Sequence, residues 1–234
     1  MAVIGVGIDI GQKHDPTAIA VVEVEQRFAE THYVVRFLER RPLGEPYPVI
    51  ARRLGEVIGN VRLVVFDPRQ RLPVSAPATL NLSVYADATG VGQPIVDILA
   101  EAGETIIAVY FTHGDRRTEE HGRITLGKAW LVSRLKSLFQ TGRIHLPTTA
   151  EAFAMKQELL DYEIRVDENA NDKYGAFKVG AHDDLATALG LAVGADPRGK
   201  EATSYSYLTS DDGDDDEREP GRWFNQLAAR GRSR

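Results

Sequence analysis

The first forty residues contain three segments dominated by Val and Ile, a pattern typical of β-strands. They are "AVIGVGIDI" (2–10), "TAIAVVEVE" (17–25) and "HYVVRFLER" (32–40), of which the third alternates less cleanly. Further strands are predicted for "VRLVVFD" (61–67), which reads as a buried strand, for "TLNLSVYAD" (79–87) and for "ETIIAVYFTHG" (104–114).

Apolar residues at helical spacing predict helices between and after these strands. In the segment 46–60, Gly59-Asn60 is expected to end the first helix, whose apolar face consists of Val49, Ile50, Leu54, Val57 and Ile58. Other helices are predicted at about 93–102, 128–141 and 149–161, and in the Ala-rich segment 181–195. Residues 115–127 predict a hairpin or a mobile loop, and residues 162–180 a hairpin around "ENAND". An opening meander followed by alternating strands and helices predicts an α/β fold, a mixed sheet with helices on both faces.

Composition narrows the class of protein. The chain has 234 residues, of which 43% are hydrophobic and 26% charged, as in one large soluble domain or a domain with appendages. No apolar run approaches the roughly 18 residues that would cross a bilayer, and the N-terminus lacks the pattern of a signal peptide. We therefore expect a cytoplasmic protein, in the host cytoplasm if it is viral, without a membrane partner. The absence of cysteine leaves carboxylate and His side chains as metal ligands.

The net charge of −6 is concentrated in one segment. Residues 211–219, "DDGDDDERE", alone carry a net charge of −6, and the rest of the chain holds 27 acidic and 27 basic residues. This composition is typical of disorder. We predict a globular domain over 1–197 and a flexible acidic tail over 198–234, which ends in the short basic segment "GRWFNQLAARGRSR". The tail is either a solubilising linker or a competitor of nucleic acid for basic surface.

Two aspartates stand at the ends of predicted strands. Asp9 shares a strand face with Gly5 and Gly7, and Asp87 ends the strand 79–87 in the same way. Glycines follow both aspartates, in "DIG" and "DATGVG", and allow backbone or a ligand to approach closely. Because paired strands lie about 4.8 Å apart, the two carboxylates could share one divalent ion if these strands are neighbours.

A third acidic group precedes the last predicted helix, in "HDD" (182–184). Capping of the helix explains Asp183 as well as a metal does, whereas Asp184 lies one step inside the helix and can project toward the sheet. His182, beside the two aspartates, is a candidate ligand or proton carrier, while His113 and His121 fit structural roles equally well. Clustered carboxylates repel one another unless cations compensate them, and oxygen ligands favour Mg²⁺ or Mn²⁺. Two such ions would support hydrolysis of a phosphodiester.

Four segments together resemble the nuclease domain of phage large terminase subunits, the motors that package viral DNA and cut the concatemer. They are "GIDIGQKHDPTAIAVV", "VYADATGVGQPIVDIL", "ITLGKAWLVSRLKSLFQTGRIHLP" and "AHDDLATALGLAVGA", in the order of that family, within residues 3 to 195. The resemblance implies a ribonuclease H-like fold and a metal-dependent DNA endonuclease with two divalent ions. The residues that it implies as ligands are Asp9, Asp87 and Asp184, with Asp183 adjacent and Asp15 as a further acidic position.

The sequence departs from the family in one respect. Large terminases carry an ATPase motor before this domain, and the pattern GxxxxGK[ST] of a phosphate loop does not occur in these 234 residues. We therefore expect either an excised domain or a separately encoded nuclease. An ATPase motor domain, a small terminase and a portal are the protein partners that the resemblance implies.

Basic residues concentrate between 116 and 143. A hairpin with Arg116, Arg117 and Arg123, followed by Lys128 at a helix start, could track the phosphates of double-stranded DNA without reading sequence. Arg134, Lys136 and Arg143 also belong to this basic region, and Arg134 and Lys136 fit ordinary solvated helix charges at least as well. Trp130 fits the core.

Two other classes of function remain open from the residues. A sugar-kinase or actin-like phosphotransferase also opens with a D-x-G turn after its first strand, but "GQKHDP" fits it poorly and "HDD" is unexplained by it. A non-catalytic module that docks on DNA or on a portal could keep the fold without the activity. Loss of DNA cleavage on replacement of Asp87 would support the nuclease, and ATP binding without cleavage would support the phosphotransferase.

Overall fold

The computed structural model describes residues 2–11, 15–64, 80–112, 116–120, 123–166, 172–175 and 182–194. The predicted acidic tail over 198–234 and the residues His113 and His121 lie outside these ranges, so the predictions made for them stay predictions.

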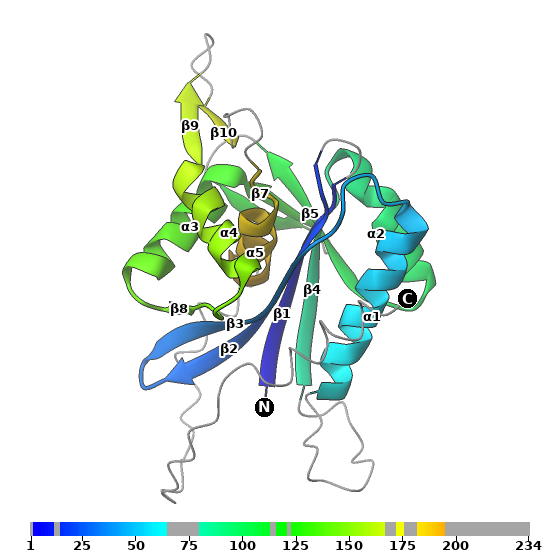
Figure 1. The fold of residues 1–234 in the computed structure, drawn as a ribbon, viewed down its shortest axis with the longest axis horizontal. Helices are drawn as coiled ribbons and strands as arrows, with labels where there is room; N and C mark the ends of the chain where they lie inside the picture. The colour runs from blue at the N-terminus through cyan, green and yellow to red at the C-terminus, as the bar shows by residue number, and fades with distance from the viewer. Residues whose placement is uncertain are drawn as a thin grey trace, which may run out of the picture.

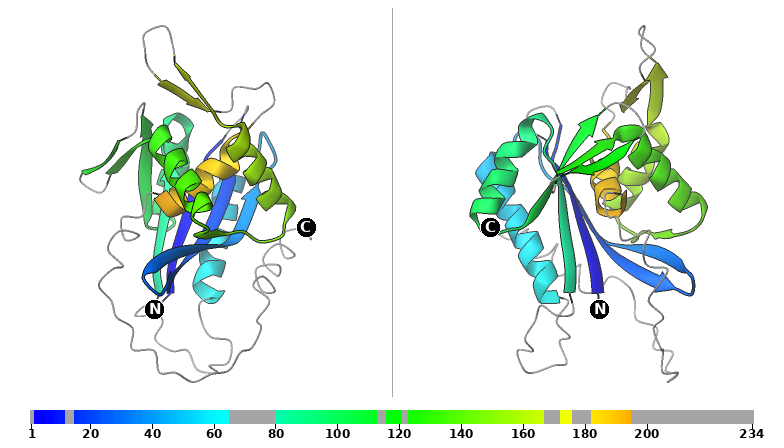
Figure 2. Two further views of the ribbon diagram at one scale, coloured as in Figure 1. Left: turned by 90° about the vertical axis from the view of Figure 1, so that its left-hand side faces the viewer. Right: turned by 180° about the vertical axis from the view of Figure 1, so that it is seen from behind.

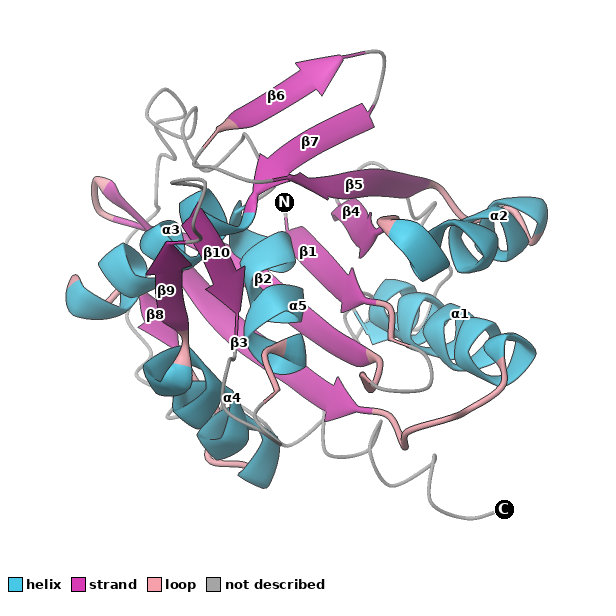
Figure 3. Ribbon diagram, turned by 90° about the horizontal axis from the view of Figure 1, so that it is seen from above, coloured by secondary structure: helices cyan, strands magenta, loops and turns pink. Residues whose placement is uncertain are grey.

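Eight strands form one mixed sheet in the order β6-β7-β5-β4-β1-β2-β3-β8. The opening meander is antiparallel and consists of β1 (Ala2–Asp9), β2 (Ala18–Arg27) and β3 (Glu30–Arg40). On the other side of β1, the strands β4 (Leu80–Asp87), β5 (Ile106–Thr112) and β7 (Arg123–Gly127) continue the sheet in parallel. The outer strands are β6 (Arg117–Glu120), antiparallel to β7, and β8 (Ile144–His145), parallel to β3. Figure 3 shows these strands as one twisted sheet, from β6 at the top to β3 at the bottom.

Helices cover both faces of this sheet, as predicted (Figure 1). One face packs on α1 (Tyr47–Val64) and on α2 (Gln93–Glu101), which follows the short 3-10 helix η2 (Gly90–Gly92). The other face packs on α3 (Lys128–Gln140), α4 (Ala150–Asp161) and α5 (Asp184–Gly194). A separate hairpin of β9 (Glu163–Val166) and β10 (Asp172–Gly175) follows α4 and projects from the body of the protein (Figure 2).

The alternation along β1 determines how its two faces pack. Ile4, Val6 and Ile8 are buried in the core beneath α1 and α2. On the opposite face, a Cβ atom at Gly7 would overlap the carbonyl oxygen of Ala188, and one at Gly5 would lie 2.5 Å from that of Ala192. The glycines therefore allow α5 to lie directly on the central strand, and this contact holds the start of α5 beside the end of β1.

The first helix corrects two predictions. Gly59 and Asn60 do not end it, because α1 continues to Val64, and the predicted strand 61–67 therefore begins as helix; its last three residues lie outside the described ranges. Val61 is only 1% exposed and extends the buried face of Leu54 and Ile58 by one further turn. Burial of Val61 outweighs the cost of about 1 kcal/mol for a helical glycine.

The remaining predicted elements are confirmed within a few residues. The predicted hairpin within 115–127 is present as the antiparallel pair of β6 and β7 at the edge of the main sheet, and the strands that flank "ENAND" pair as β9 and β10.

Among the described residues, no helix combines the length and the hydrophobicity that crossing a bilayer requires.

Candidate metal centre

The site is built first on two neighbouring parallel strands. In the pairing of β1 with β4, Ile8 lies opposite Ala86, and the same register places Asp9 level with Asp87. The expectation that these strands are neighbours is therefore correct. Asp87 is held by its own turn, since its Oδ1 accepts a hydrogen bond of 2.8 Å from the backbone N–H of Thr89. The hydroxyl of Thr89 in turn accepts one from the backbone N–H of Phe111, which ties the end of β4 to β5.

The glycines that follow the two aspartates serve the packing of the chain itself. A Cβ atom at Gly11 would overlap the carbonyl oxygen of Asp15, and one at Gly92 would overlap that of Asp87. Gly11 also donates its N–H to the hydroxyl of Thr17 at 3.2 Å. Close approach of backbone thus shapes the turns that carry both carboxylates.

The start of helix α5 supplies two further carboxylates, one from the residue before the helix and one from its first residue. Asp183 immediately precedes it, and its backbone carbonyl accepts a hydrogen bond from the N–H of Thr187. Its carboxylate lies 3.5 Å from Nζ of Lys128, the first residue of α3. Asp184 is the first residue of α5 and is only 3% exposed.

The electrostatics of the site are those of crowded carboxylates. Burial, followed by repulsion from Asp87, raises the pKa of Asp9 well above its ordinary value. Burial also raises the pKa of Asp87, against the opposing hydrogen bonds from Thr89. Burial would lower the pKa of Lys128, but Asp183, Asp9 and Asp87 raise it. We call these four residues the Lys128 group, because one ammonium ion opposes three carboxylates.

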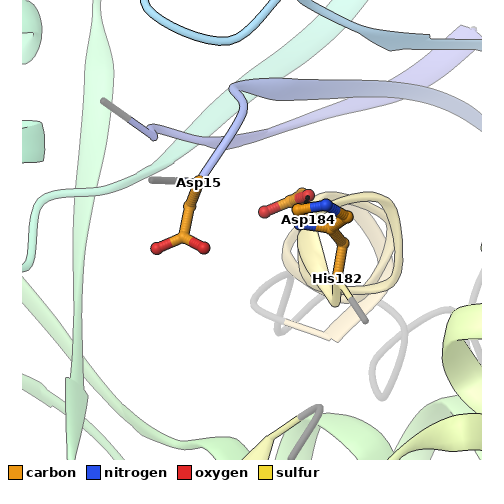
Figure 4. Close-up of side chains that lie close together, drawn as sticks. All are labelled: Asp15, His182 and Asp184. Atoms are coloured by element: carbon orange, nitrogen blue, oxygen red, sulfur yellow. Dashed lines mark ion pairs between the residues drawn. The ribbon is translucent and has the colours of Figure 1, made fainter. Parts of the chain in front are cut away.

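A second set of ligand atoms lies beside the first. One ligand atom each from Asp15, His182 and Asp184 lies within 4.8 Å of the others (Figure 4). His182 Nδ1 is 3.6 Å from Asp184 Oδ2, and the same oxygen is 3.6 Å from Nε of Arg40 at the end of β3. Burial raises the pKa of Asp184 to about 7, although Arg40 opposes the shift. We call these three residues, together with Arg40, the Arg40 group.

The ligand atoms of the Arg40 group fit a divalent cation. Asp184 Oδ2 and His182 Nδ1 are both buried, and neither has a hydrogen-bond partner in the described part of the chain. Buried polar atoms normally have a partner, so such a pair pointing at Asp15 fits an ion better than an apolar packing role. Carboxylate oxygens with one imidazole are ligands of Mg²⁺ or Mn²⁺. The positions predicted from sequence, Asp9, Asp87, Asp183 and Asp184 with Asp15 and His182, are thus brought together.

Two charged residues of this region were not predicted. Arg40 contacts Glu158, a residue of α4 that is 6% exposed, and the other carboxylate oxygen of Glu158 accepts a hydrogen bond of 2.9 Å from the N–H of Ala186 in α5. A sequence signal existed for Glu158, because an acid occupies a core position on a helix whose other buried residues are Ala152, Met155 and Leu159. Only the fold connects it with Arg40.

The basic residues predicted to contact DNA divide into two places. Lys128 lies in the site itself, while Arg116, Arg117 and Arg123 belong to the β6–β7 hairpin or directly precede it. Arg116 is exposed, Arg117 pairs with Glu119 at 2.9 Å, and the guanidinium of Arg123 lies 3.5 Å from the ring centre of Tyr110. Because β7 runs directly into α3, the hairpin and Lys128 form one continuous segment.

Two neighbouring residues of α3 are structural. Arg134 donates to the hydroxyl of Tyr33 at 3.0 Å and to the carbonyl of Val193 at 3.4 Å, so it fastens α3 to β3 and to the end of α5. Trp130 is partly buried against the core, as predicted.

Known proteins resemble the chain in structure but not detectably in sequence. No family model matches the sequence, and no curated protein matches it. The large terminase nuclease of the thermophilic phage G20c matches 82% of this chain and 81% of its own, with a TM-score of 0.56 and 19% identity. That nuclease is also known with bound magnesium and with bound cobalt.

Two further structures come from other viruses. The human cytomegalovirus terminase nuclease domain, in a Mn-soaked and inhibitor-bound form, has a TM-score of 0.51 and 15% identity over 85% of both chains. The large terminase of bacteriophage HK97 has a TM-score of 0.53 and 16% identity, over 84% of this chain and 40% of its own. The chain therefore has the ribonuclease H-like fold of terminase nuclease domains, and the resemblance noted from the sequence is confirmed at the level of the fold.

Proposed function

We propose that this protein is a metal-dependent DNA endonuclease of viral genome packaging, which cuts concatemeric DNA by hydrolysing phosphodiester bonds. The observation that carries the proposal is that five aspartates converge at the ends of the central strands β1 and β4. They come from these two strands, from the segment between β1 and β2, and from the start of α5. Such a concentration of negative charge is costly without cations. The shared fold with terminase nucleases supports the same function.

The residues have distinct roles in this proposal. Asp9, Asp87 and Asp184 would hold two divalent ions, Mg²⁺ or Mn²⁺, with Asp183 as a further ligand and Asp15 and His182 as auxiliary ones. Asp9 is the central residue, because its carboxylate interacts electrostatically with Asp87, Asp183 and Asp184. The bound ions would supply Lewis-acid chemistry, activating water and stabilising the leaving oxygen.

The chain itself contributes orientation and phosphate binding. The N–H of Thr89 fixes the rotamer of Asp87, and the hydrogen bond between Glu158 and the first turn of α5 fixes the place of Asp184. Lys128 would lose its present counter-charges if Asp9, Asp87 and Asp183 held metal ions, and it could then turn to a DNA phosphate. The hairpin arginines Arg116, Arg117 and Arg123 would extend this contact along the backbone of double-stranded DNA.

The wider assembly follows from the likeness to terminases. An ATPase motor, supplied as another domain or another chain, would deliver the DNA, and a small terminase and a portal would complete the packaging machinery. Nothing in the basic segments resembles a base-reading helix, so we expect weak sequence preference.

A plasmid-cleavage assay tests the proposal. Purified protein is incubated with supercoiled plasmid in Mn²⁺, in Mg²⁺ and in EDTA, beside the variant Asp87→Asn. We expect cleavage in the metals, none in EDTA and none by the variant. Absence of cleavage in every metal, by protein shown to be folded, would contradict the proposal and favour a docking module. Cleavage by Asp87→Asn at the wild-type rate would remove Asp87 from the site.

A further inference from the structure

Glu158 is a buried charge that links three elements. Its Oε2 accepts a hydrogen bond of 2.9 Å from the N–H of Ala186 in the first turn of α5, and its Oε1 contacts Nη2 of Arg40 at the end of β3. The carboxylate of Glu158 is only 6% exposed, and a buried charge is costly unless both of its oxygens have polar or charged partners. Both carboxylate oxygens of Glu158 are therefore engaged by these two partners.

Arg40 lies between two carboxylates. Its Nη2 contacts Glu158, and its Nε lies 3.6 Å from Asp184 Oδ2. A guanidinium ion matches a carboxylate with two parallel hydrogen bonds when nothing else engages it. Without the charge of Glu158, Asp184 would be the remaining carboxylate that the described chain offers to Arg40. The guanidinium would then compete with a divalent ion for the same carboxylate oxygens.

We propose that Glu158 is a positioning residue that keeps Asp184 available to a metal ion by holding the guanidinium of Arg40. This inference rests on the proposed metal site. It differs from a purely structural role, in which the Glu158–Arg40 pair would stabilise the packing of α4 on α5 and leave metal affinity unchanged. It also assigns α4, which supplies none of the proposed ligands, a part in metal binding.

The variant Glu158→Gln tests the inference. Glutamine keeps the size of the side chain and an oxygen that can accept from Ala186, but it removes the charge that holds Arg40. We expect Mn²⁺ binding, measured by isothermal titration calorimetry on the full chain, to weaken roughly 10- to 100-fold, as for outer-shell partners of other metal sites. Thermal unfolding in EDTA shows separately whether the variant is folded.

Glu104→Gln is the matched control. Glu104 pairs with Arg62 at 2.6 Å, and its side chain is only 13% exposed. It lies two residues before β5, at the opposite end of the strands from the aspartates. The same substitution there removes an ion pair without touching the site, and Mn²⁺ affinity should stay at the wild-type value.

The double variant Glu158→Gln/Arg40→Gln gives the decisive comparison. It removes the charges of Glu158 and Arg40 together, so no guanidinium is left to occupy Asp184, and we expect Mn²⁺ affinity to return close to the wild-type value. A folded double variant that binds Mn²⁺ as weakly as the single variant would overturn the inference. If Glu158→Gln alone does not fold, a folded double variant that binds Mn²⁺ at least 10-fold more weakly than the wild-type protein would overturn the inference.

The remaining outcomes separate this inference from the proposed function. Wild-type affinity in folded Glu158→Gln would overturn the positioning role alone. Wild-type protein that binds no Mn²⁺ would overturn the metal site and the positioning role with it.

Discussion

The Lys128 group and the Arg40 group meet the same electrostatic problem with different cations. In the first, a primary amine from the start of α3 lies 3.5 Å from Asp183 and opposes Asp9 and Asp87. In the second, a guanidinium ion from β3 faces Asp184 while Glu158 holds its other edge. In the described part of the chain, Lys128 interacts with the site carboxylates and, at 5.5 Å, with the ring of Phe111, so metal binding would release it. Arg40 would keep its partner Glu158 when a metal ion binds.

The difference indicates how one acidic site can both bind a substrate phosphate and orient a metal ligand. A cation without an independent anchor can move to a substrate phosphate, whereas a cation with a buried counter-charge stays in place and orients a ligand. Lysine suits the first role because its ammonium ion sits on a flexible stem, and arginine suits the second because its planar fork engages two carboxylates at once.

The largest expected effect is that of replacing Asp9, the central ligand, and it is compared with the effect of replacing Asp15, an auxiliary ligand. Asp9→Asn should lower the rate of Mn²⁺-dependent plasmid cleavage by more than the roughly 100-fold that loss of an outer-shell partner can cost. Asp9 belongs to the Lys128 group and also interacts electrostatically with Asp184 of the Arg40 group. Asp15→Asn touches the Arg40 group alone and should cost about 10-fold. Both variants should fold as wild type by circular dichroism. Equal losses in the two variants would contradict the central position of Asp9.

A substitution at Gly7 should disturb the packing of α5, the helix at whose start carboxylates of both groups lie. Gly7→Ala places a methyl group against the backbone of Ala188 and Ala192, which cannot yield as a side chain would. We expect a loss of about 1 to 3 kcal/mol in the free energy of unfolding, measured by urea denaturation. Gly59→Ala is the control, because its Cβ would enter open space on α1, and it should stabilise the protein by about 0.5 to 1 kcal/mol. Unchanged stability in Gly7→Ala would mean that α5 does not lie as closely on β1.

The Arg40 group should make metal-free protein sensitive to pH. The folded-state pKa of Asp184 is raised from 3.8 to about 7, so the folded protein binds a proton more tightly than the unfolded chain. The resulting stability is fully present below pH 3.8 and is lost as pH rises through about 7. Asp9 and Asp87, whose pKa values are also raised, add an effect of the same sign.

Thermal unfolding in EDTA between pH 4 and pH 8 measures this dependence, and Asp184→Asn should flatten it. Mn²⁺ should reverse the trend at the upper end of the range, because it binds the ionised carboxylate. A stability that rises steadily with pH in EDTA, over the interval in which Asp184 ionises, would contradict the crowding of these carboxylates.

The smallest expected effect concerns Lys128 and DNA. If Lys128 turns to a phosphate, Lys128→Met should weaken binding to duplexes of any sequence and reduce the slope of log affinity against log salt by about 1. Fluorescence anisotropy in Ca²⁺, with the duplex shown to be intact on a gel, measures the slope while the carboxylates are neutralised by a divalent ion. The control is Lys156→Met, which removes an exposed lysine of α4 that makes no described contact with the site. Identical slopes in the two variants would leave Lys128 as a counter-ion of the aspartates alone.

Much of the architecture could be predicted because local patterns were consistent with the fold. The period-two alternation of β1 and β4 separated their apolar faces from the faces with glycine and aspartate, and this placed both carboxylates at strand ends. The error at Gly59-Asn60 arose where a local stop signal met a buried position one turn further, Val61, whose burial only packing reveals.

The sequence by itself determined the fold class, the glycine face on which α5 lies and the set of aspartates, because these depend on residue type and on spacing within single elements. Only the tertiary structure decided how charges from distant segments are paired. It brought Asp183 to Lys128, and Asp184 to Asp15 and Arg40, and it joined Arg40 to Glu158 from α4. The physical reason is that a buried charge is paired through space, by whichever elements the sheet and its helices bring within a few ångströms.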